Sequence, residues 1–148
     1  PPLAAMAWLS SNVDSADLAR EVATLGAQPR LIAVTGNLGV GLPIGRAVRA
    51  DWIGSECSDW ISDGVLRIED AGGLTPARRA HLDGLMAKER SRLARDIVKG
   101  RPDIVLFDRK RFDWRAWALQ DPAIASSLKH YRLAATVKGI EVWARPSR

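Results

Sequence analysis

The sequence predicts an α/β fold, a three-layer Rossmann-like sandwich with a mainly parallel sheet and a C-terminal β-hairpin on its edge. Short apolar, β-branched segments alternate with segments of helical apolar spacing, which is typical of parallel sheets covered by helices. Two strand-like segments around a Lys-Gly turn close the chain and predict the hairpin. With 148 residues, 47% of them hydrophobic, the chain can bury the core of one domain.

In the first half of the chain, a helix is predicted after a cap at Asp14 or Ser15, and it should end at Gly26. The segment 30–35, RLIAVT, is predicted as a buried strand that opens into a glycine-rich loop. Three short elements should follow the loop. They are a helix over 44–48, a strand over 51–54 and a turn that contains Trp60.

The second half carries stronger signals. Thr75 is a helix cap, Pro76 suits the first turn and Gly100 ends a helix of about six turns. A buried strand is predicted over 103–108. The remaining signals are the caps Asp113 and Asp121 of two helices and the hairpin turn Lys138-Gly139.

We expect one domain over 1–148, in which 13–148 are globular. The apolar start PPLAAMAWL has no initiating Met, so 1–12 are interpreted as a linker from a preceding membrane segment. Lys and Arg outnumber Asp and Glu by 22 to 17, which gives a net charge of +5. A basic chain of this kind favours anionic partners.

The loop after the first strand carries the candidate ligand-binding residues Gly36, Asn37, Gly39 and Gly41. A P-loop would need Gly-Lys-Ser/Thr, but Leu and Pro follow the last of these glycines, and the spacing G-x-G-x-x-G is not met either. The interpretation that we favour is that the glycines let the chain turn away from the sheet. The alternative is a soluble nucleotide-binding Rossmann-like enzyme that uses this loop.

Metal and cofactor sites are not predicted. The candidate ligands His81, His130 and Cys57 lack any recurring spacing, and a single cysteine cannot form an internal disulfide. An acidic trio could serve acid/base chemistry or bind a cation, although such residues in a Gly/Ser-rich segment more often form a solvated turn. The trio is Glu56, Asp59 and Asp63.

The segment DRKRFDWRAW places basic residues among aromatic ones. Three interpretations stay open: helix packing with a charged outer face, which we rank first, then contact with an anionic membrane surface, then nucleic-acid binding. We expect no nucleic-acid partner. The candidate membrane or anion contacts are Arg109, Lys110, Arg111, Trp114 and Arg115.

An ordered set of short motifs over residues 31–148 resembles the end of bacterial multi-spanning GT-C type glycosyltransferases, the relatives of dolichyl-phosphate-mannose-protein mannosyltransferases. The motifs are Pro102-Asp103, Phe112-Asp113-Trp114, Asp121-Pro122, Tyr131-Arg132, and Val142-Trp143 to Arg145. The stretch GLPIGRAVRADWIGSECSDWISDG is similar to the segment that follows the first strand in such domains.

The resemblance implies a non-catalytic soluble domain of a membrane glycosyltransferase-like protein. The parent would be anchored in the membrane, with this domain on the periplasmic side, packed near the membrane and assisting the binding of the acceptor or of the lipid-linked sugar donor. The partner would be the membrane-embedded part of the same polypeptide. No catalytic residue can be assigned, since the family's catalytic acid lies in an early loop between membrane helices. A protein-interaction module is a further alternative.

Overall fold

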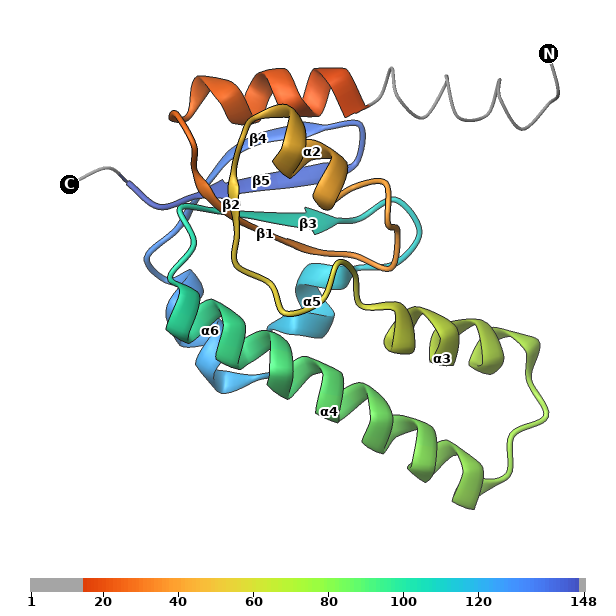
Figure 1. Ribbon diagram of the computed structural model, residues 1–148. Coiled ribbons are helices and arrows are strands. Elements are labelled where there is room, and N and C mark those ends of the chain that lie inside the picture. Colours follow the sequence, from red (N-terminus) through yellow and green to blue (C-terminus); the bar gives the residue numbers. More distant parts are fainter. Residues whose placement is uncertain (1–14, 147–148) are drawn as a thin grey trace, which may run out of the picture.

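The computed structural model describes residues 15–146 and shows a mixed α/β fold (Figure 1). Its single described sheet has five strands in the order β2-β1-β3-β5-β4. The strands are β1 (Arg30–Val34), β2 (Asp51–Trp52), β3 (Ile104–Asp108), β4 (Arg132–Val137) and β5 (Ile140–Ala144). The expected linker 1–12 lies outside the described residues.

The sheet is mixed, and the expectation of a mainly parallel sheet holds only for its first strands. β1 pairs in parallel with β2 and with β3, whereas β5 runs antiparallel to both β3 and β4. The terminal hairpin is confirmed at the predicted turn: Lys138 and Gly139 have φ angles of 47° and 82°. Two successive positive φ values suit the right-handed twist of the strands.

Helices cover both faces of this sheet (Figure 1). Residues 15–24, which are helical, and α2 (Leu42–Ala47) lie against one face, while α4 (Pro76–Gly100), α5 (Trp114–Ala118) and α6 (Pro122–Leu128) lie against the other. Because successive strand residues face opposite sides, β1 contributes to two cores. Leu31 packs with the first group of helices and Ile32 with the second.

Residues 60–71 form a helix, α3 (Trp60–Ala71), where the sequence predicted only a turn. The interpretation as a turn followed the Gly/Ser-rich and acidic character of the segment and overlooked the apolar spacing of Ile61, Val65 and Ile68. α3 and α4 form a helical hairpin that extends away from the sheet (Figure 1). The chain reverses between them at glycines with φ near +75°.

The predicted caps of the later helices are confirmed. The Thr75 hydroxyl accepts a hydrogen bond from the Arg78 N–H, the Asp113 carboxylate accepts one from Ala116, and Asp121 does the same for α6. These bonds satisfy N–H groups that a helix start leaves without partners. Within residues 15–146, none of the helices combines the length and the apolarity that crossing a bilayer requires.

Candidate functional site

The carboxyl ends of β1 and β3 lie at one edge of the sheet, where a ligand site is expected. The two strands are parallel neighbours, yet the chain after β1 runs to β2 on one side and the chain after β3 runs toward β5 and β4 on the other. In open α/β sheets, ligands bind in the crevice that opens where neighbouring connections diverge in this way. Thr35 follows β1 and Asp108 ends β3, so both lie at this edge.

Three buried residues join the loops at this edge, and we call them the carboxyl-edge knot: Thr35, Asp59 and Asp108. The Thr35 N–H donates to Asp59 Oδ2 over 3.0 Å, and its hydroxyl donates to Asp108 Oδ2 over 2.9 Å. The Asp59 N–H donates in return to the Thr35 carbonyl at 2.7 Å. Hydrogen bonds within the chain therefore close the space between these three residues, while Asn37, Gly39 and Lys110 line a separate hollow of about 190 Å³.

Glu89 of α4 ties the two helices of the hairpin together next to Asp59, the N-cap of α3. Its side chain is fully buried and accepts hydrogen bonds from the N–H groups of Ile61 and Ser62, at 3.2 and 2.6 Å. Glu89 thus supplies the hydrogen-bond acceptors for the first N–H groups of α3. This explains why the N-cap residue Asp59 makes no capping bond with its side chain. A carboxylate at a helix N-terminus is also favoured by the helix dipole.

The environment of Asp59 favours the neutral carboxyl group. Burial, and then the negative charge of Glu89, raise the pKa of Asp59 to about 8, although the hydrogen bond from Thr35 and the charge of Arg92 act in the opposite direction. At neutral pH this carboxyl group is therefore mostly protonated. The expectation that the acidic trio forms a solvated turn is wrong for Asp59, which is 3% exposed.

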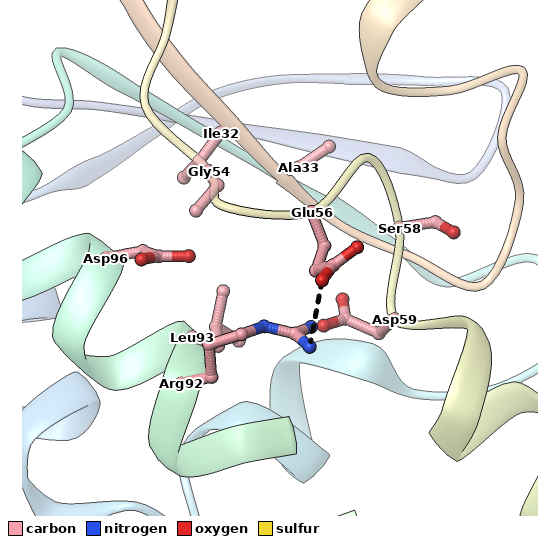
Figure 2. A pocket seen from close by; sticks show the side chains of 9 residues that line it. All are labelled: Ile32, Ala33, Gly54, Glu56, Ser58, Asp59, Arg92, Leu93 and Asp96. Carbon is pink, nitrogen blue, oxygen red and sulfur yellow. Dashed lines mark ion pairs between the residues drawn. The ribbon is translucent and has the colours of Figure 1, made fainter. Parts of the chain in front are cut away.

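Figure 2 shows the cavity beside Asp59, where Arg92 lies 3.7 Å from Glu56 and the side chains of all three are turned toward one another. Asp96, on the same helix as Arg92, accepts hydrogen bonds from the N–H and hydroxyl of Ser55. The cavity has room for about one water molecule. It can hydrate these polar groups but cannot hold an organic substrate.

The glycines of the loop after β1 are explained by neighbouring side chains. A Cβ atom on Gly36 would lie 2.5 Å from the Cβ of Asp63, and one on Gly41 would lie 2.8 Å from the ring of Trp52. The Gly39 N–H donates to the side chain of Asn37 over 2.8 Å, which closes a local turn. The side chain of Asp63 thus occupies the space next to Gly36.

We expect Gly36→Ala to lower the free energy of unfolding by about 1 to 3 kcal/mol, because the new methyl group overpacks against an atom close to the α3 backbone. Gly39→Ala is the matched control, since its Cβ would meet only the tip of the Asn37 side chain, at 3.2 Å. Urea unfolding of the two variants measures the difference. Equal stabilities would show that the loop has room beside Gly36.

The candidate contacts of the basic aromatic segment lie in different environments. Trp114 is 3% exposed and packs against the rings of Phe112 and Trp117, so it presents no face to a membrane. Arg109 and Arg115 both reach the Glu141 carboxylate, at 2.7 and 3.1 Å.

Of the candidate cations in this segment, Lys110 and Arg111 differ from the paired Arg109 and Arg115. Lys110 and Arg111 are exposed, and neither forms an ion pair with a residue that the structure describes. The hydrogen bond to Glu141 raises the pKa of Arg109, so this guanidinium stays charged and paired. The segment is therefore mainly a packing element with two free positive charges.

The amino ends of the strands carry features that the sequence did not reveal. Arg101, Arg132 and Arg145 line an open groove there, although they come from the end of α4, from β4 and from the segment after β5. The left-handed backbone of Arg101 also stands out, with φ at 46°. No local sequence signal joins these positions. Within residues 15–146, no three acidic, His or Cys side chains come together as a metal site.

Comparisons with protein-family models, with curated proteins and with solved structures gave no match to this chain.

Proposed function

We propose that the chain is a non-catalytic domain of a membrane glycosyltransferase-like protein, on the periplasmic side and packed near the membrane-embedded part of the same polypeptide. The observation that carries the proposal is the structural use of the resembling residues. The Tyr131 hydroxyl donates to the Pro102 carbonyl, and Asp103 accepts from the N–H of Arg30. A motif set that holds strands and helices together fits a domain without its own chemistry.

The carboxyl edge supports the same proposal. The polar groups of the carboxyl-edge knot are hydrogen-bonded to one another, and the cavity beside them holds about one water molecule. An active site needs room for its substrate next to the reacting groups. The helices on both faces of the sheet fit the proposal that the domain is a Rossmann-like sandwich without a nucleotide at its carboxyl edge.

Four residues form the surface that we propose faces the membrane, and we call them the carboxyl-edge surface: Leu38, Trp60, Lys110 and Arg111. Each lies within three residues of a member of the carboxyl-edge knot. Leu38 is 61% exposed and Trp60 is 60% exposed. A surface that carries exposed tryptophan and free cations is typical of proteins that meet lipid headgroups.

The expected result is weak, salt-sensitive flotation of this chain with vesicles that contain anionic lipid. Each surface cation adds about 1 kcal/mol, so Lys110→Ser/Arg111→Ser should weaken the binding by about thirtyfold. Raising the salt to about 1 M should release the chain, because the Debye length falls to about 3 Å. Vesicles that carry a polyprenyl-phosphate sugar should float the chain without any cleavage of the sugar.

The control is Arg78→Ser/Lys88→Ser, which removes two exposed charges from α4 instead. Equal loss in both double variants would mean that only net charge matters, and that result would contradict the proposed surface. Cleavage of the lipid-linked sugar by this chain alone would contradict the non-catalytic assignment. Tight binding of single-stranded DNA without lipid binding would replace the membrane interpretation.

A further inference from the structure

A groove of about 780 Å³ lies at the end of the sheet opposite the carboxyl-edge surface. It runs along the starts of β1 and β4 and the end of β5, and we call it the amino-edge groove. Its lining combines cations with apolar side chains. The lining includes Leu25, Pro29, Arg101, Arg132, Leu133 and Arg145.

Three of the four arginines that line the groove lack carboxylate partners, whereas the fourth, Arg30, lies 3.7 Å from Asp51. Arg101, Arg132 and Arg145 form no ion pair with any residue in the described range 15–146, whereas Arg109 and Arg115 at the other edge both reach Glu141. The same three arginines line an adjoining hollow, to which Lys129 and His130 also contribute. Asp103 is the acidic residue in the lining, so positive charge dominates the groove.

Arg145 is held in place within the groove. Its Nη2 donates to the Tyr131 hydroxyl over 3.2 Å, and its guanidinium lies 5.0 Å from the centre of the Tyr131 ring. Burial raises the pKa of Tyr131, which keeps its hydroxyl protonated to donate to the Pro102 carbonyl. The buried Nε of Arg145 has no hydrogen-bond acceptor among the described residues. A fixed guanidinium loses little freedom when an anion binds.

Arg101 occupies a position where helix ends favour glycine. It is the C-cap of α4 and adopts left-handed angles, φ 46° and ψ 60°. The need to end the helix does not explain an arginine at this position, because glycine adopts these angles without steric strain. Lining the groove does give a reason, since the side chain brings a third guanidinium beside Arg132 and Arg145.

The other part of the lining is apolar. Leu133, in β4, is 50% exposed, and Leu25, before β1, is 39% exposed. Small-molecule sites typically combine such apolar walls with a few polar groups, in volumes of about 300 to 1,000 Å³. The groove therefore has both a cationic end and a surface for a less polar body.

We propose that the amino-edge groove binds a water-soluble organic phosphate of nucleotide size. The phosphate groups lie against Arg101, Arg132 and Arg145, because the planar guanidinium fork matches phosphate oxygens in a bidentate manner. The less polar part of the ligand packs on Leu25 and Leu133. This inference is independent of the membrane function, since the groove and the carboxyl-edge surface lie at opposite ends of the sheet.

Calorimetric titration of the whole chain with inorganic pyrophosphate and with adenosine diphosphate tests the proposal. Both should bind, and the nucleotide should bind more tightly because its body adds apolar contact. Arg101→Gly should weaken both about tenfold, the usual cost of a charge-assisted hydrogen bond. The same change should leave the fold as stable or more stable, because glycine suits the left-handed angles.

Arg49→Gly is the matched control. Arg49 is also an exposed arginine with a left-handed backbone, φ 54°, and it does not line the groove. Its loss should change the affinity less than twofold. Equal weakening by the two variants, or no heat of binding from either probe at about 1 mM, would overturn the proposal. So would binding of anionic vesicles through Arg101 without binding of either soluble phosphate.

Discussion

Replacing Glu89 by alanine is expected to lower the free energy of unfolding by about 3 to 5 kcal/mol, which is the range for removing one partner from a buried polar cluster. The change leaves the N–H groups of Ile61 and Ser62 without their acceptor and opens space under the start of α3. It also removes the carboxylate that Arg92 approaches to 3.4 Å. Urea unfolding measures the loss.

Hydrogen exchange locates the effect. In Glu89→Ala, the amides of the first turn of α3 should exchange faster than those of β3, because the helix start loses its cap before the sheet opens. Asp83→Ala is the control, since Asp83 is an exposed acidic residue on the same helix and should change stability by less than about 0.5 kcal/mol. Similar losses in both variants would rule out a special role for Glu89.

The parts of the fold that were predicted correctly depend on local signals. Each predicted cap, Thr75, Asp113 or Asp121, accepts a hydrogen bond from a residue two or three positions ahead. Both partners therefore lie within the short stretch of sequence that predicts the cap. The hairpin turn is local for the same reason. α3 was missed, although its apolar spacing was present, because the Gly/Ser-rich character of the preceding segment favoured a turn.

The arrangement at the carboxyl edge could not be predicted, because its bonds span long separations. Thr35 meets Asp59 across 24 positions and Asp108 across 73. The ion pairs of the basic aromatic segment could not be predicted for the same reason. Arg109 bonds to Glu141, which lies 32 positions away in a strand whose register the sequence does not specify. Tryptophan is common both in cores and at lipid surfaces, so composition alone does not place Trp114.

The Asp59→Asn variant should be as stable as the parent chain, or slightly less stable, in acidic solution. In alkaline solution it should be more stable than the parent chain. The pKa of Asp59 is raised from 3.8 to about 8 in the folded chain, so the folded state holds a proton that the unfolded state has already released between these values. Stability from this group is therefore lost as the pH rises from about 4 through about 8. Asparagine stays neutral and can still accept the bond from Thr35, so the variant avoids that loss.

At pH 9 we expect the variant Asp59→Asn to be more stable than the parent chain by about 2 kcal/mol or more, while at pH 5 the two should be alike or the parent slightly better. Urea unfolding at several pH values gives the curve. Burial is the first cause of the raised pKa and the charge of Glu89 is the second, so Glu89→Gln should move the midpoint of the parent's stability loss to lower pH. A parent chain whose stability does not fall between pH 5 and 9 relative to Asp59→Asn would show that Asp59 is ionised in the fold. In that case Arg92 and the Thr35 N–H would outweigh burial at the carboxyl-edge knot.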